Sequence, residues 1–289
     1  MRIANNAGRL GLVRNERVLD VATASGGVFA ADPAEVFPRW SEFVAWASSI
    51  DVETHPDAAP LAGARLEAPS PRPRQVIGIG LNYADHAAES GLPLPDEPVV
   101  FTKFSSSVTG PDVEVSLPGP TVDWEAELVV VIGRAGRNIP LADARSHIAG
   151  FTVGQDLSER TVQWHDQPAQ FSFGKSFENF APTGPVIVTL DEFSDPDRLA
   201  IGATIIGEDG TRTEVQNGTT AQLIFPVDDL IARLSAVVEL LPGDLIFTGT
   251  PPGVGASRDP KRFLVAGETL VTEIEGIGAI TQRFASRSS

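Results

Sequence analysis

Short apolar runs separated by turns rich in glycine and proline recur along this chain. The runs that have the length and composition of β-strands are QVIGIGLNY, PVVFTKF, AELVVVIG, GFTVGQD, GPVIVTL, LAIGATIIG, DLIFTG and ETLVTEIEG. Helical segments are fewer, chiefly ADARSH and VDDLIARLSAVVELL, the second of which stops at Pro242. This pattern favours a mixed, β-rich α+β fold with a few helices outside the sheets over regular βαβ alternation.

A proline-rich segment divides the chain. Residues 1–68 alternate short β-like runs with turns and contain one amphipathic stretch, PAEVFPRWSEFVAWASS. The following APSPRPR cannot hold regular structure and is typical of a linker. We therefore expect a small N-terminal domain over residues 1–68 and a larger domain over residues 74–286.

The composition narrows the chemistry of any active site. The chain has no cysteine, which excludes disulfides, thiolate nucleophiles, zinc–thiolate sites and iron–sulfur clusters. Its four histidines argue against a metal site built from several histidines. A metal ion would be held by oxygen atoms, which favours Mg²⁺ or Mn²⁺, with Ca²⁺ as a further candidate.

The formal net charge of −16 argues against nucleic acid as a partner, because such a surface repels phosphate backbones. An anionic substrate would therefore need a local positive field, which a metal ion supplies. No apolar run approaches the roughly 20 residues that cross a bilayer, and the start of the chain lacks the apolar stretch of a secretory signal. We expect a cytoplasmic protein with no membrane partner.

The segment VDWEAELVVVIG carries the strongest chemical signal. In a β-strand, Asp123, Glu125 and Glu127 lie on one face, and the apolar run that follows predicts a buried strand. Carboxylates crowded on a buried face repel each other unless a cation lies between them. A solvated strand end is the alternative, and the adjoining apolar run favours metal binding.

GFTVGQDLSERT supplies a further carboxylate where a predicted strand ends. Asp156 has two interpretations, a metal ligand or the N-cap of a short helix with Glu159 as its capping-box partner. Arg160 follows and could pair with an acid or bind a carboxylate of the substrate.

NYADHAAES places His86 and Glu89 three residues apart on a predicted helix, close enough for a hydrogen bond. Such a carboxylate fixes the imidazole tautomer, as in a general base, although an exposed pair without a role is the alternative. The adjacent loop GLPLPDEP suggests a lid. Lys175 in GKSF could face an anion or be an ordinary surface lysine, and Thr250 lies in the tight turn TGTPPGVG, where it could donate a hydrogen bond or belong to a plain turn.

Two segments resemble each other within the chain. KFSSSVTGP, from Lys103, and KSFENFAPTGP, from Lys175, share a lysine, aromatic residues, serine and a terminal Thr-Gly-Pro. Their spacings differ by two residues, so internal duplication and chance similarity both stay open.

Five motifs, taken in order, resemble the fumarylacetoacetate hydrolase family. They are GLNYADHAAE, DWEAELVVVIG, GFTVGQDLSER, GKSFENFAPTGP and GDLIFTGTPPGVG, and the resemblance spans roughly residues 74 to 280. It implies β-sheets rolled as a sandwich around a metal site, with a small N-terminal domain, and a homodimer.

The resemblance also assigns roles to residues. It implies that Glu125, Glu127 and Asp156 bind Mg²⁺ or Mn²⁺, and that His86 and Glu89 form a dyad that activates water. It further implies that Lys175, Arg160 and Thr250 contact the substrate. Tyr83 and Gln163, which lie in or beside these motifs, are also assigned to the substrate pocket.

The expected substrate is a 2-oxo acid, which can chelate a cation through its carboxylate and 2-oxo oxygen. Our leading hypothesis is hydrolytic C–C cleavage of an acylpyruvate such as fumarylpyruvate, a product of ring fission in aromatic catabolism. The same site would also serve an oxaloacetate decarboxylase or a 2-hydroxydienoate isomerase, and the motifs do not separate these reactions. A 2-oxo acid binding protein without turnover is the alternative from another class.

Overall fold

The computed structural model describes residues 1–89, 91 and 93–287. Ser90, at the end of the predicted helical segment, and Leu92, in the predicted lid loop, lie outside the described residues.

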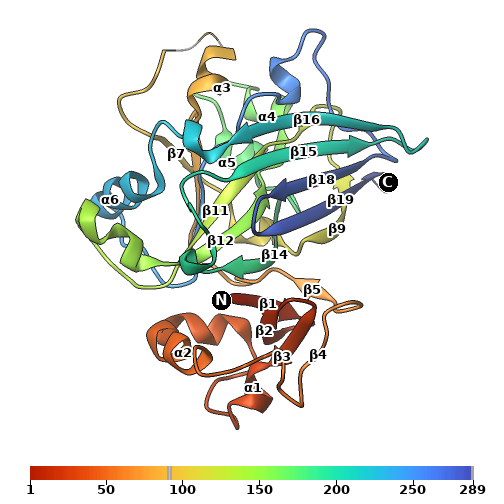
Figure 1. Cartoon of the computed structure of the whole chain (residues 1–289). Coiled ribbons are helices and arrows are strands. Elements are labelled where there is room, and N and C mark those ends of the chain that lie inside the picture. Colours follow the sequence, from red (N-terminus) through yellow and green to blue (C-terminus); the bar gives the residue numbers. More distant parts are fainter. Residues whose placement is uncertain (90, 92, 288–289) are drawn as a thin grey trace.

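The larger sheet has twelve strands, and its main path runs β4-β3-β2-β1-β14-β12-β11-β17-β6-β7 (Figure 1). Two short strands leave this path, because β5 pairs with β1 and β8 with β14. The bounds are β1 Arg2–Asn6, β2 Arg9–Arg14, β3 Arg17–Asp20, β4 Ala59–Pro60, β5 Leu66–Glu67, β6 Val76–Gly80, β7 Val99–Thr102, β8 Val108–Thr109, β11 Ala126–Ile132, β12 Ile148–Gln155, β14 Ala181–Val188 and β17 Leu245–Phe247.

Strand β11 lies at the centre of the molecule and is buried on both faces. Leu128 and Val130 face one apolar cluster, whereas Val129 and Val131 face the other. A strand covered on both sides needs a continuous apolar run, which explains the sequence AELVVVI.

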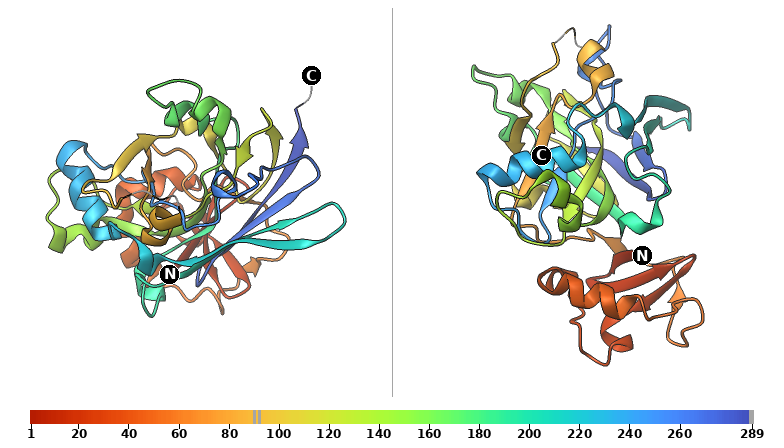
Figure 2. Two further views of the ribbon diagram at one scale, coloured as in Figure 1. Left: turned by 90° about the horizontal axis from the view of Figure 1, so that it is seen from above. Right: turned by 60° about the vertical axis from the view of Figure 1, so that its left-hand side comes forward.

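A second, five-stranded sheet packs against one face of the first in the order β16-β15-β18-β19-β9. Its strands project to one side of the molecule (Figure 2, left). Their bounds, with those of the isolated pair β10–β13, are β9 Asp112–Leu117, β10 Val122–Asp123, β13 Ser158–Glu159, β15 Ala200–Ile206, β16 Arg212–Thr219, β18 Thr269–Ile274 and β19 Gly278–Ser286. This arrangement confirms the predicted mixed, β-rich α+β class.

The helices are short and lie outside the sheets. They are α1 Val21–Ala24, α2 Trp40–Ala47, α3 Ala84–Glu89, α4 Arg160–Gln163, α5 Phe171–Gly174 and α6 Val227–Val237, with 3₁₀ segments at Pro33–Arg39, Ser105–Ser107, Leu141–His147, Leu190–Glu192, Thr220–Gln222 and Gly255–Ser257. Among the helices of the described residues, none is long and apolar enough to cross a membrane.

Two helix predictions need correction. The predicted helix over ADARSH is a 3₁₀ segment, and α6 ends at Val237 instead of continuing to Pro242. The helix stops because Val238 turns to extended backbone and Leu240 exchanges two backbone hydrogen bonds of 3.0 Å with Gly136.

Residues 1–68 form a lobe below the rest of the molecule (Figures 1 and 2). Strand β1 nevertheless pairs with β14, where Arg2 lies opposite Val188, so the first residues extend the larger sheet. The apolar cluster of the lobe includes Phe29 and Phe43 together with Val129 from β11. The division into domains at 1–68 and 74–286 stays a prediction.

Candidate metal and substrate site

Glu125, Glu127 and Asp156 meet at one point, with one ligand atom of each lying within 4.8 Å of the others. Strands β11 and β12 bring them together, because Glu127 lies opposite Gly154 and Asp156 directly follows β12. The backbone N–H of Asp156 also donates to the carbonyl oxygen of Glu125 at 2.9 Å. Three carboxylates at this distance match the oxygen ligands that Mg²⁺ and Mn²⁺ prefer.

Asp123 does not join this cluster, which corrects the expectation that Asp123, Glu125 and Glu127 share one face of an unbroken strand. The strand is interrupted between β10 and β11, because side-chain amides replace the ladder there. The oxygen Oε1 of Gln155 accepts from Glu125 N–H at 2.9 Å, and that of Gln216 accepts from Ala126 N–H at 2.9 Å.

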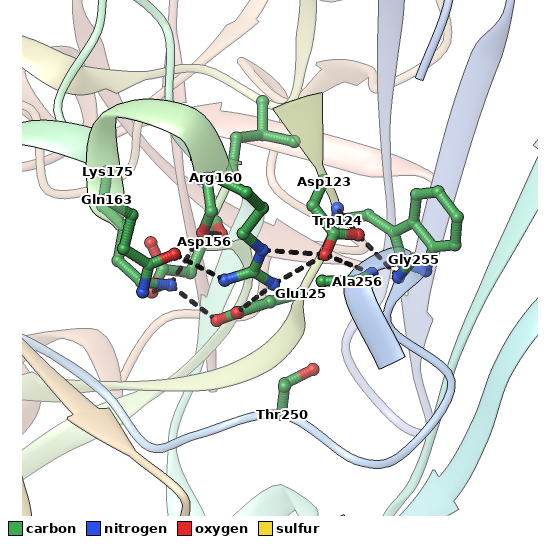
Figure 3. A network of polar contacts seen from close by, with 12 residues as sticks. Asp123, Trp124, Glu125, Asp156, Arg160, Gln163, Lys175, Thr250, Gly255 and Ala256 are labelled. Atoms are coloured by element: carbon green, nitrogen blue, oxygen red, sulfur yellow. Dashed lines mark hydrogen bonds and ion pairs between the residues drawn. The ribbon is translucent and has the colours of Figure 1, made fainter. Parts of the chain in front are cut away.

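Asp123 instead fixes the loop that follows β17. Its carboxylate accepts from the backbone N–H of Gly255 at 2.7 Å and of Ala256 at 3.0 Å (Figure 3). Because Arg160 donates to both Asp123 and Glu125, Asp123 connects the acid cluster to the loop that follows β17.

Lys175 lies directly on the acid cluster. Its Nζ donates to Glu125 Oε2, Asp156 Oδ2 and Ser158 Oγ, each at 2.7 Å (Figure 3). Burial works against the charge of this ammonium, but Asp156 and Glu125 outweigh it and raise the pKa of Lys175. The predicted contact of Lys175 with substrate stays a prediction.

Lys103 is a site residue that the sequence reasoning missed. Its buried Nζ donates to the other oxygen of the Asp156 carboxylate, Oδ1. The available signal was the internal resemblance between KFSSSVTGP and KSFENFAPTGP. These segments lie side by side, since β8 pairs in parallel with β14 and Val108 lies opposite Ala181. Lysines from both segments therefore reach the same aspartate.

Arg160, at the start of α4, binds protein groups with all three guanidinium nitrogens. Nε donates to Asp123 Oδ2 at 2.8 Å, Nη2 to Glu125 Oε1 at 2.7 Å and Nη1 to Gln163 Oε1 at 2.8 Å (Figure 3). The N-cap of α4 is Glu159, so the capping interpretation of Asp156 is wrong. The contact of Arg160 with substrate stays a prediction.

The pKa values of Glu125 and Glu127 in the cluster are shifted in opposite directions. Burial opposes the ionisation of Glu125, but Lys175 and Arg160 hold its pKa at about 2. Burial, Asp156 and Glu125 raise the pKa of Glu127 well above its ordinary value. The three oxygen donors fit a divalent cation, and such an ion would offset most of the negative charge that the three acids carry once Glu127 ionises.

We therefore predict that cation binding displaces a proton from Glu127. The raised pKa keeps this carboxyl protonated at lower pH, so Mn²⁺ affinity should increase as pH rises through that pKa and level off above it. Calorimetric Mn²⁺ titrations in buffers of different ionisation enthalpy measure the released proton. A pH-independent affinity without proton release would contradict the prediction.

His86 and Glu89 form the predicted pair on α3. The ring atom Nδ1 of His86 lies 2.9 Å from Glu89 Oε2. Glu89 Oε1 also accepts from the backbone N–H of Gly253 at 3.1 Å, which attaches α3 to the loop after β17. His86 lines the same cavity as Glu125 and Lys175.

The TGTPPGVG turn holds Glu127 from the other side. Gly249 N–H donates to Glu127 Oε2 at 2.7 Å, and Thr250 Oγ1 donates to the carbonyl of Ala126 at 2.9 Å. Thr250 also lines the cavity. Gly249 has a φ of +102°, and an added Cβ would lie 2.8 Å from Asn82 Cβ.

Replacing Gly249 with alanine should destabilise the fold by about 1–3 kcal/mol and weaken cation binding, because the backbone is strained and the donor to Glu127 moves. Gly210→Ala is the matched control, since Gly210 also has positive φ (+79°) but nothing within 4 Å of an added Cβ. Urea unfolding compares the two variants. Equal losses of stability and unchanged Mn²⁺ affinity in both would show that the contact at Asn82 has no effect.

The remaining predicted residues lie in different places. Gln163 is buried and lines the cavity, next to Arg160. Tyr83 is fully buried, and among the described residues its hydroxyl has no hydrogen-bond partner. Burial, Glu127 and Asp85 raise the pKa of Tyr83. Its side chain does not line the cavity, so its contact with substrate stays a prediction.

The cavity beside the cluster has a volume of about 230 Å³. Its polar lining residues include His86, Glu125, Arg160, Gln163, Lys175 and Thr250, and its apolar lining residues include Ile79, Leu81, Phe101, Trp164, Phe171 and Val254. Leu81 has a φ of +51°, a strained conformation for a leucine, at the turn from β6 towards α3. The cavity is large enough for a small organic acid.

Three comparisons with known proteins agree with this architecture. Oxaloacetate tautomerase FAHD2A, mitochondrial, from Homo sapiens is 46% identical over 218 residues, which are 75% of this chain and 68% of that protein. The crystal structure of a Mycobacterium smegmatis protein labelled HpcE is 51% identical with a TM-score of 0.93, and covers 100% of both chains. Maleylpyruvate hydrolase from Sphingobium sp. SYK-6, in complex with manganese(II) and pyruvate, is 28% identical with a TM-score of 0.80, and also covers 100% of both chains.

The fold and the acid cluster define a β-rich enzyme with a carboxylate site that fits a divalent cation. The sequence profile described as fumarylacetoacetate (FAA) hydrolase C-terminal matches residues 75–285. The chain belongs to the fumarylacetoacetate hydrolase family, as its motifs indicate.

Proposed function

We propose that this enzyme hydrolyses a C–C bond in an acylpyruvate-type 2,4-dioxo acid with the help of Mg²⁺ or Mn²⁺. One observation carries the proposal: His86, which is paired with Glu89, and Glu125 of the acid cluster line the same cavity. The pyruvate and manganese in the maleylpyruvate hydrolase neighbour support a 2-oxo acid on the cation.

Glu125, Glu127 and Asp156 would hold the cation. When bound, it supplies Lewis-acid stabilisation for the negative charge that develops on the 2-oxo oxygen of the substrate. Lys175 and Lys103 keep the Asp156 carboxylate in place through opposite oxygens.

His86 is the base in this proposal. Because its Nδ1 faces Glu89, the other ring nitrogen, Nε2, would take the proton from water. The water oxygen bonds to C4 of the substrate, the C3–C4 bond breaks, and its electron pair stays with the pyruvate half. The proton then passes to C3, which yields pyruvate and a carboxylic acid.

Oxaloacetate tautomerisation is the second candidate, because the human relative with 46% identity carries that name. In that reaction His86 would move a proton between C3 and solvent while no C–C bond breaks. Decarboxylation of oxaloacetate and isomerisation of a 2-hydroxydienoate would use the same acid cluster. The candidate reactions therefore differ in whether they release pyruvate and in the substrate from which they release it.

The test supplies acetylpyruvate and oxaloacetate to the Mg²⁺- or Mn²⁺-loaded enzyme and follows pyruvate with a coupled dehydrogenase. Pyruvate from acetylpyruvate, lost in Glu125→Gln and retained in the exposed control Glu35→Gln, is the expected result. Pyruvate only from oxaloacetate would favour decarboxylation. Accelerated enol loss of oxaloacetate without pyruvate would favour the tautomerase.

We also propose that the enzyme works as a homodimer in the cytoplasm. Light scattering should give about twice the chain mass of 30.6 kDa. A particle of single-chain mass would refute the dimer.

A further inference from the structure

One wall of the cavity is aromatic. Phe101 on β7, Trp164 after α4 and Phe171 at the start of α5 all line it. The ring centroids of Phe101 and Phe171 are 5.6 Å apart, and those of Trp164 and Phe171 are 5.3 Å apart in an edge-to-face arrangement. We call these three residues the aromatic wall.

The aromatic wall leads from the acid cluster to the mouth of the cavity. At its inner end, Lys175 Nζ lies 5.1 Å from the centre of the Phe101 ring. At its outer end, Trp164 is 53% exposed although it lines the cavity. A ligand whose 2-oxo acid end binds the cation at Glu125 would therefore extend its other end along these rings. An apolar or planar group there would remove aromatic surface from water.

The charges around the acid cluster nearly balance. Three cations and four carboxylates meet in this largely buried network: Lys103, Lys175 and Arg160, with Asp123, Glu125, Glu127 and Asp156. With all of them ionised, one negative charge is left over. A divalent cation changes this to one positive charge, which the single carboxylate of a 2-oxo acid neutralises. A second carboxylate on the ligand would remain uncompensated.

Arg160 lines the cavity and lies four residues before Trp164 of the aromatic wall, and it already donates to protein groups. Two carboxylates, from Asp123 and Glu125, accept from its Nε and Nη2, while the Gln163 amide oxygen accepts from Nη1. The other lining cation, the ammonium of Lys175, donates to Glu125, Asp156 and Ser158. A distal carboxylate would therefore have to share each cation with carboxylates of the protein.

We infer that the substrate arm beyond C4 is uncharged and apolar, with an aryl group as the best match, and that the aromatic wall selects it. This inference rests on the proposed function. It names 4-aryl-2,4-dioxobutanoates as the preferred substrate class, in place of acylpyruvates such as fumarylpyruvate that end in a second carboxylate.

The test compares two inert ligands of the Mn²⁺-loaded enzyme by calorimetry. Both 2-oxo-4-phenylbutanoate and 2-oxoglutarate carry the chelating 2-oxo acid and lack the 4-oxo group that cleavage needs, and they differ in a terminal phenyl or carboxylate. We expect the phenyl ligand to bind at least about tenfold more tightly, which corresponds to about 1.4 kcal/mol. Trp164→Ala should bring this ratio close to one.

Phe173→Ala is the matched control. Phe173 is an aromatic residue of α5 that is 65% exposed and packs on Phe104, outside the cavity lining, so the ratio should not change. Pyruvate is titrated as a third ligand, because its binding tests the proposed function alone. Equal or tighter binding of 2-oxoglutarate, together with binding of pyruvate, would overturn the inference and leave the proposed function intact. Failure of pyruvate and both ligands to bind would overturn the two proposals together.

Discussion

Asp156→Asn is expected to abolish turnover, with a loss of at least about a thousandfold, because the cation-dependent stabilisation of the transition state is worth several kcal/mol. Asp156 is fully buried and accepts from Lys103 and Lys175 at opposite oxygens. The amide can neither balance these ammonium groups nor act as an anionic ligand. Activity with saturating Mn²⁺ and the Mn²⁺ dissociation constant together measure the effect.

The same substitution should lower the free energy of unfolding. Removing one partner of a buried ion pair costs about 3–5 kcal/mol, because the remaining charge is left unpaired. Asp143→Asn is the control, since Asp143 is an exposed residue of the 3₁₀ segment Leu141–His147. A stable, fully active Asp156→Asn enzyme would remove this residue from the proposed site.

His86→Ala is expected to reduce turnover by about 10²–10⁴-fold, the usual contribution of a positioned general base. Because Glu89 acts through His86, Glu89→Gln should cause a smaller loss of turnover. Rates are measured on whichever substrate releases pyruvate or loses its enol form.

His165→Ala provides the comparison for this experiment. His165 is exposed and pairs only with its neighbour Asp166 among the described residues, so turnover should not change. If His86→Ala turns over its substrate at the full rate, the base must be another group.

Part of the acid cluster could be predicted from local sequence, and the family resemblance added Asp156, which the local pattern also allowed as a helix N-cap. The alternation of acids in VDWEAELVVVIG and the aspartate after GFTVGQ each follow strand geometry, and pairing of β11 with β12 brings Glu125, Glu127 and Asp156 together. The β-rich class followed from strand-length apolar runs in the same way.

Contacts between distant segments could not be predicted. The strand breaks before Ala126 because the side-chain amides of Gln155 and Gln216 accept the backbone hydrogen bonds there. No residue near Asp123 in the sequence predicts this break. The end of α6 likewise depends on Leu240 pairing with Gly136. Each of these outcomes is decided by tertiary partners.

The contact of Lys103 with Asp156 was only partly predictable from the sequence. The resemblance of its segment to that of Lys175 was visible in sequence, but only the parallel pairing of β8 with β14 shows that both lysines reach one aspartate. The aromatic wall was not predicted, because Phe101 comes from a strand 70 residues before Phe171.

The metal site is the central claim, and a crystal soaked in Mn²⁺ tests it most directly through anomalous scattering. We predict one strong peak about 2.1 Å from oxygens of Glu125, Glu127 and Asp156, as expected for oxygens on a small divalent cation. A crystal that binds no Mn²⁺ at these three oxygens would contradict the account.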